Sequence, residues 1–157
     1  REIGNELMKA TEPVMDIESA LDASVKQMGN MSKDAFYHLK NKEFIKYVQN
    51  AVVAHRNWIH NLEKMVQGRT VVPLQLDSTK CGFGHFYYSI TPTIPGVRQI
   101  WDGLEEKHRK FHEYGRDAIQ ALFDEDYQKA GRICKEAEEY SRGLIADMEK
   151  MIELADT

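Results

Sequence analysis

Hydrophobic residues recur at helical spacing along most of this chain, and no stretch shows the strict alternation of a half-buried strand. In the first forty residues the steps alternate between four and three, which is a heptad pattern. The positions are Ile3, Leu7, Ala10, Val14, Ile17, Leu21, Ser24, Met28, Met31 and Ala35. So narrow an apolar seam needs a partner helix, from a second copy or from elsewhere in the chain. We interpret residues 1–40 as a dimeric signalling stalk rather than an ordinary amphipathic helix.

Two features are expected to interrupt this first helix. Pro13 has no backbone N–H, so it predicts a kink or a separate stub over residues 1–12. The polar pair Asn41-Lys42 predicts a break, after which a second helix ends near Gly68. Its apolar face holds Phe44, Val48, Ala51, Val52, His55, Ile59, Leu62 and Val66.

Residues 69–80 have the composition of a loop, and a short helix is predicted to begin near Cys81, capped by a side chain from the Asp77-Ser78-Thr79 cluster. A third helix has its inner face at Val97, Trp101, Leu104, His108, Phe111, His112, Gly115, Ile119 and Leu122. The acidic turn 124–126 is predicted to cap a last helix that continues to Ile152.

These segments predict an all-α protein. We expect an antiparallel four-helix bundle with a short extra helix that carries the cysteine, preceded by a coiled-coil-like helix. The expected division is a stalk remnant at residues 1–40 and a bundle domain at residues 41–157.

Composition narrows the classes of function. The chain has 157 residues and a net charge of −4, which disfavours a nucleic-acid partner because such partners select basic surfaces. No apolar run reaches the roughly 18 residues that span a bilayer, so we expect no direct membrane contact in this fragment. The chain begins at Arg1 rather than Met, so we expect it to be part of a longer protein.

The candidate chemistry lies in His55, Cys81, His108 and His112. His108 and His112 stand four apart on one helix, so both rings project from the same face. Three imidazoles and one thiol form a complete tetrahedral ligand set for Zn²⁺. With only Cys81 and Cys134 available, a reducing cytoplasm and a metal-bound or free thiol are favoured over a disulfide scaffold.

Each of these residues also has an ordinary structural interpretation. A single inward histidine is more often hydrogen-bonded in the core than a ligand, and a single cysteine is more often a small hydrophobe. Their joint occurrence on inward faces favours a metal site. His38, His60 and His85 lack that support and are expected to be solvated, with His85 the best substitute ligand.

The motifs His55-x-x-Trp58, Asp77-x3-Cys81-x-x-Gly84 and His108-x3-His112 resemble the chemoreceptor zinc-binding domain of bacterial signal transduction. The resemblance extends over about residues 41 to 155. It implies a helical bundle that holds one zinc through His55, Cys81, His108 and His112, and a role in sensing zinc or hypochlorite. The family usually has tryptophan two residues after the glycine, where this chain has Phe86, a packing change that leaves the ligands intact.

The upstream heptads resemble the end of the signalling stalk of a methyl-accepting chemotaxis protein, and the domain is also similar to modules joined to diguanylate cyclases. The resemblance therefore implies a homodimer that works with chemotaxis signalling proteins through an attached receptor domain. Asp77 is expected either to orient a ligand from outside the coordination shell or to cap a helix.

Three rival functions remain open. A zinc hydrolase of the His-Glu-x-x-His type is disfavoured because Arg109 follows His108, and because a fourth protein ligand leaves no open position. A di-iron haemerythrin-like oxygen-binding domain needs carboxylate bridges, yet Ile59 stands four residues after His55. The third rival is a metal-free dimeric interaction module. We expect a zinc-binding sensory module that is not an enzyme.

Overall fold

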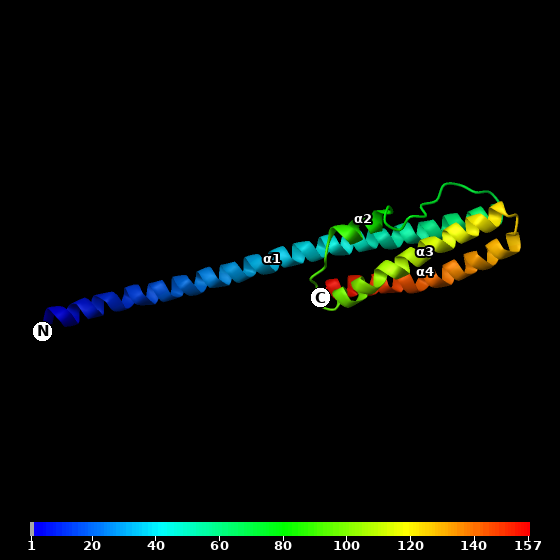
Figure 1. The fold of residues 1–157 in the computed structure, drawn as a ribbon. Coiled ribbons are helices and arrows are strands. Elements are labelled where there is room, and N and C mark those ends of the chain that lie inside the picture. Colours follow the sequence, from blue (N-terminus) through cyan, green and yellow to red (C-terminus); the bar gives the residue numbers. More distant parts are fainter. Residues whose placement is uncertain (1) are drawn as a thin grey trace. The chain divides into compact units, whose positions relative to one another are not determined.

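The computed structural model describes the backbone of residues 2–157 and the side chains of residues 20–32 and 40–157. Its helices are α1 (Glu2–Gly68), α2 (Gly82–Ser89), α3 (Val97–Phe123) and α4 (Tyr127–Ala155), as Figure 1 shows. No strand occurs within residues 2–157. The predicted all-α class is confirmed.

The helix α1 is assigned without interruption through Pro13 and through Asn41-Lys42, so the expected stub and the expected break are both wrong. A proline inside a helix removes one hydrogen bond and tends to bend the backbone, but it does not have to end the helix. Asn and Lys cost only tenths of a kcal/mol in a helix interior, so a polar pair without glycine is a weak stop signal.

The chain divides into two compact units, Arg1–Lys40 and Asn41–Thr157. In the first unit the side chains of residues 20–32 are all exposed. They include the heptad residues Leu21, Met28 and Met31, which are 63%, 61% and 65% exposed. Ser24 is exposed as well, whereas the heptad positions from Ile3 to Ile17 and Ala35 lie outside the described side chains, as does His38.

In the second unit the last part of α1 packs with α3 and α4 around one core. Phe44 lies against Trp101 with ring centroids 5.8 Å apart, and His55 lies against His108 at 4.9 Å. Positions that advance along α1 therefore meet positions that advance along α3, so these two helices run in the same direction.

The helix α4 runs the opposite way. Lys107 of α3 pairs with Asp147 of α4. Tyr114, which follows Lys107 in α3, packs on Tyr140, which precedes Asp147 in α4. The expected antiparallel arrangement thus holds for α3 and α4 but not for α1 and α3. The reason is the long connection between Gly68 and Val97, which returns the chain to the end of the bundle where α1 entered (Figure 1).

Within residues 41–157 the unit contains three long helical segments and the short α2. A fourth long helix, expected from the sequence, is not supplied by this unit. Hydrophobic periodicity predicts which residues of a helix face a core, but it does not predict whether the neighbouring helix comes from the same chain or from another.

Candidate metal centre

Four side chains, from two helices and from the residue that precedes a third, converge at one point in the core of the second unit. His55 comes from α1, Cys81 immediately precedes α2, and His108 and His112 come from α3. One ligand atom from each of the four lies within 4.8 Å of every other. The structure thus brings together all four residues that the sequence singled out.

Two pairs of donor atoms in this group match the edges of a metal tetrahedron. His108 Nε2 lies 3.1 Å from His112 Nε2 and 3.2 Å from the Cys81 sulfur. Bonds of about 2.0 Å to nitrogen and 2.3 Å to sulfur at tetrahedral angles give edges of about 3.3 and 3.5 Å. The side chains are therefore already near the spacing that a four-coordinate zinc requires.

His55 carries the strongest sign that a cation belongs here. Its Nδ1 lies 2.6 Å from the backbone carbonyl of Ala51, which fixes the proton on Nδ1 and leaves Nε2 as a lone-pair donor. His55 Nε2 is the buried side-chain polar atom that has no hydrogen-bond partner within the described residues. Because orphaned buried polar groups are costly, this atom calls for a metal or another electrophile.

His112 is oriented in the same way by the connection between α1 and α2. Its Nδ1 lies 2.8 Å from the backbone carbonyl of Gln75, so its Nε2 is also left to face the other ligand atoms. His108 Nε2 lies within 3.2 Å of both His112 Nε2 and the Cys81 sulfur, and its ring packs perpendicular to that of Phe83 at a centroid distance of 5.1 Å. Outer partners and packing thus hold the three rings in place.

Cys81 is the N-cap of α2, and its sulfur accepts a hydrogen bond from the backbone N–H of Gly84 at 3.3 Å. The expected cap from Asp77, Ser78 or Thr79 is therefore replaced by the cysteine itself. A sulfur at this position faces the positive end of the helix, which favours a thiolate. Burial opposes that effect and raises the pKa of the Cys81 thiol in the metal-free protein.

The imidazoles are held in the neutral form that metals bind. Burial lowers the pKa of His55 to about 4 and that of His108 to about 2, and burial also lowers the pKa of His112. All three side chains are therefore uncharged at neutral pH, so they can act as ligands without first losing a proton.

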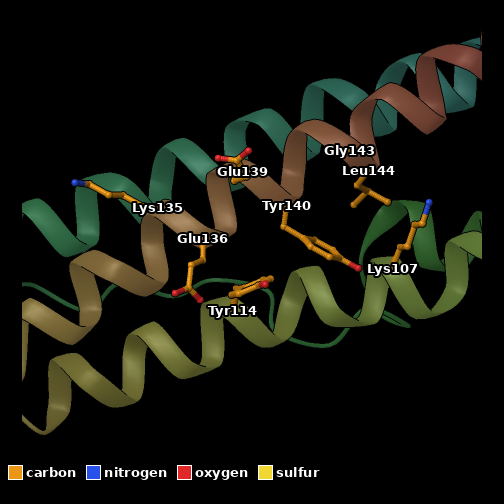
Figure 2. Close-up of a pocket in the computed structure, with 8 residues that line it drawn as sticks. All are labelled: Lys107, Tyr114, Lys135, Glu136, Glu139, Tyr140, Gly143 and Leu144. Carbon is orange, nitrogen blue, oxygen red and sulfur yellow. The ribbon is translucent and has the colours of Figure 1, made fainter.

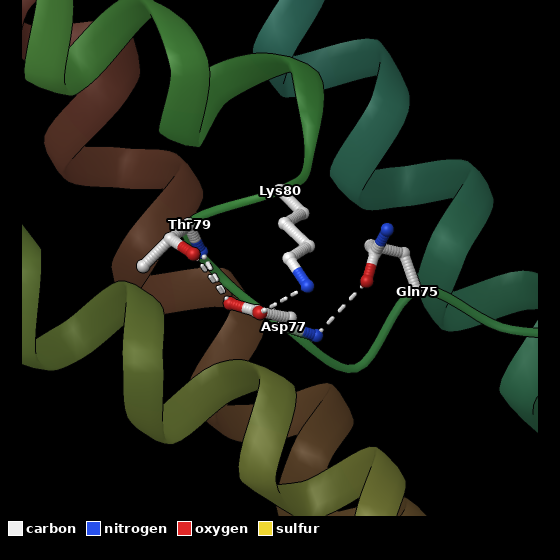
Figure 3. Close-up of polar contacts among 4 residues, drawn as sticks. All are labelled: Gln75, Asp77, Thr79 and Lys80. Atoms are coloured by element: carbon white, nitrogen blue, oxygen red, sulfur yellow. Dashed lines mark hydrogen bonds and ion pairs between the residues drawn. The ribbon is translucent and has the colours of Figure 1, made fainter.

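Asp77 organises the turn before Cys81 rather than touching a ligand. Its carboxylate accepts hydrogen bonds from the N–H and hydroxyl of Thr79, at 2.9 and 2.7 Å, and Lys80 lies 3.6 Å away (Figure 3). These hydrogen bonds lower the pKa of the Asp77 carboxyl. Asp77 thus caps the turn. Its negative charge also adds to the effect of burial in raising the pKa of the Cys81 thiol.

The remaining candidates lie outside this centre. His60 and His85 are exposed, as predicted. Cys134 is buried and forms no disulfide, and burial raises its pKa to about 11. A surface groove of about 700 Å³ between α3 and α4, lined by Lys107, Tyr114, Tyr140 and neighbours, contains none of the four converging residues (Figure 2).

Comparison with known proteins agrees with this geometry. Residues 55–119 match the family model of the chemoreceptor zinc-binding domain, which is a binding and sensory domain, and no catalytic family is indicated. No curated protein and no solved structure matches the chain. In the described part of the chain, no helix has the length and apolarity of a membrane span.

Proposed function

Residues 55–119 belong to the chemoreceptor zinc-binding domain family, and we propose that this domain binds one Zn²⁺ through His55, Cys81, His108 and His112 as a sensory module. A His3Cys cluster in a domain of this family supports Zn²⁺ as the metal. The ligand assignment rests on one observation above all: the buried, unpartnered Nε2 of His55 faces the other three donors.

The donor set favours a structural over a catalytic ion. Bound zinc would supply a link among α1, α2 and α3, and four protein ligands leave no coordination position for water or substrate. Such a link contributes on the order of 10 kcal/mol to folding in small zinc domains. The cluster, as defined within the described residues, holds no carboxylate, which argues against the bridges of a di-iron oxygen carrier.

The signal is proposed to enter through Cys81 or through zinc availability. The three imidazoles are only 2–4% exposed, whereas Cys81 is partly exposed, so the sulfur is the ligand that a solution oxidant reaches first. Oxidation to the sulfenic acid would remove a thiolate from the site. Loss of the metal by either route would remove the link among α1, α2 and α3 and leave only their side-chain packing to hold them together.

The output is proposed to pass through α1, which carries both His55 and the exposed heptad residues. We propose that residues 1–40 pair with a second copy as a coiled-coil stalk. The second copy would also supply the fourth long helix of the bundle. The working partners would be chemotaxis signalling proteins in the cytoplasm, reached through an attached receptor domain.

Elemental analysis of protein purified without added metal tests the assignment. The wild-type chain should contain one zinc per chain, and the double variant His108→Ala/His112→Ala should contain none. Cys81→Ser keeps an oxygen that can cap α2 but removes the thiolate ligand. It should therefore lower zinc affinity by more than about 100-fold, which exceeds the loss typical when a residue outside the coordination shell is changed.

The matched control is His60→Ala/His85→Ala, which removes two exposed histidines and should retain a full equivalent of zinc. A full equivalent in the His108→Ala/His112→Ala protein would place the metal elsewhere. A coloured protein with iron and no zinc would instead support the haemerythrin-like alternative.

A further inference from the structure

We propose that Trp58 is a positioning residue for the zinc site: together with Gly115, it holds the Gln75 carbonyl that orients His112 and sets the position from which the chain reaches Cys81. This inference rests on the zinc site proposed above and extends it to residues outside the ligand set.

The first step is a shared acceptor. The indole Nε1 of Trp58 donates to the backbone oxygen of Gln75 at 2.8 Å, and His112 Nδ1 lies 2.8 Å from the same oxygen. A carbonyl oxygen has two lone pairs, so both donors can be accommodated at once. The position of this one oxygen therefore depends on Trp58, while the tautomer of His112 depends on the oxygen.

The second step is the fit of the indole against α3. Trp58 is 7% exposed and packs on Phe111 and on His112, with ring centroids at 4.5 and 5.3 Å. A Cβ at Gly115 would lie 2.5 Å from the indole and 3.1 Å from the Leu76 side chain. Because Gly115 has no side chain, α3 leaves room there for both the Trp58 indole and the Leu76 side chain.

The third step carries this anchor to the sulfur. The Gln75 side chain accepts the N–H of Asp77 at 3.0 Å (Figure 3). The backbone N–H of Lys80 donates to the Asp77 carbonyl at 3.1 Å. Cys81 follows directly, and its sulfur lies 3.5 Å from the Ser78 carbonyl. The segment from Gln75 to Cys81 is therefore braced by its own hydrogen bonds, so a shift at Gln75 moves the sulfur as well.

The test compares Trp58→Phe with Trp101→Phe. Both remove a buried indole, but Trp101 packs on Tyr87 of α2 at a centroid distance of 4.7 Å, whereas the Trp58 indole donates to the Gln75 carbonyl. A second pair is Gly115→Ala against Gly103→Ala in the same helix, where an added Cβ meets nothing within 4 Å. Circular dichroism verifies that each variant is folded.

Three measurements are made on each protein. In the zinc-free form, long-range ¹H–¹⁵N NMR reports the tautomer of His112, which loss of stability alone would not change. Chelator competition gives the zinc affinity, and iodoacetamide gives the alkylation rate of Cys81. We expect Trp58→Phe and Gly115→Ala to populate both tautomers, weaken zinc 10- to 100-fold and speed alkylation, with both controls near wild type.

The proposal is overturned if Trp58→Phe and Gly115→Ala keep the wild-type tautomer and affinity, or if the controls lose as much. Should Trp58→Phe fail to fold, the Gly115→Ala and Gly103→Ala pair decides by the same measurements. A wild-type protein that binds no zinc would refute the proposed function, whereas the tautomer in the metal-free protein would still decide the role of Trp58.

Discussion

At the scale of single residues, the site is built from polar atoms whose burial would be unfavourable without a shared partner. His55 and His112 each have one ring nitrogen beside a backbone carbonyl and the other directed at the centre. Leaving a buried acceptor unsatisfied costs about 1–3 kcal/mol. We therefore expect the metal-free protein to be less stable than the zinc-bound protein. The ring nitrogens directed at the centre should account for much of the difference in free energy of unfolding.

The histidines also give the metal-free protein a defined dependence on pH. The pKa of His55 falls to about 4 and that of His108 to about 2 in the fold, against about 6.5 in an unfolded chain. Below pH 6.5 the unfolded chain binds protons that the fold does not, so stability is present above 6.5 and is lost as pH falls towards these lowered values. The slope is at most about 1.4 kcal/mol per pH unit for each histidine.

In the presence of a chelator, the melting temperature should therefore decrease from pH 7.5 to pH 5, and zinc at pH 7.5 should raise it. Differential scanning fluorimetry measures both effects. If the protein in chelator melts at pH 5 at the same temperature as at pH 7.5, or at a higher one, the imidazoles are not buried in neutral form.

At the scale of elements, α2 depends on a close approach between its first turn and the preceding turn. A Cβ at Gly84 would lie 2.0 Å from the backbone oxygen of Ser78, whereas a Cβ at Gly82 would meet nothing within 4 Å. Gly84 is therefore required for packing, while Gly82 is not.

Gly84→Ala should destabilise the protein by about 1–3 kcal/mol, the usual range for an overpacked site, and should weaken zinc binding because α2 carries Cys81. Gly82→Ala, two residues away in the same helix, should stay within about 0.5 kcal/mol of wild type. Urea unfolding and chelator competition measure the two effects. Equal behaviour of the two variants would contradict the close approach of Gly84 to the Ser78 backbone.

These elements also show what the sequence could and could not predict. The spacing of His108 and His112 on an apolar face gave their joint direction, because helical periodicity fixes which side chains share a face. The carbonyl of Gln75 could not be predicted, since every residue has such an oxygen and only the folded connection brings this one to His112. The parallel course of α1 and α3 was missed for the same reason, because it depends on the path of residues 69–96.

At the scale of the whole molecule, the chain combines a unit with a closed core and a unit whose described side chains are exposed. Phe111, Leu62 and Leu104 are fully buried in the second unit. In the first, Leu21, Met28 and Met31 are more than 60% exposed at heptad spacing. Fully burying a side chain of this size is worth about 1.5–3 kcal/mol, so a second helix along this stripe would be strongly stabilised.

The full chain should therefore be a dimer, and Met28→Glu should weaken it by placing a charge in the seam. Asn30→Glu is the matched control, because it adds the same charge at an exposed position outside the heptad series. Sedimentation velocity over a range of concentrations should show dissociation of Met28→Glu alone, while both variants keep one zinc per chain. If Met28→Glu sediments as the wild type does, the stripe does not hold two copies together, and its exposed residues must serve another contact.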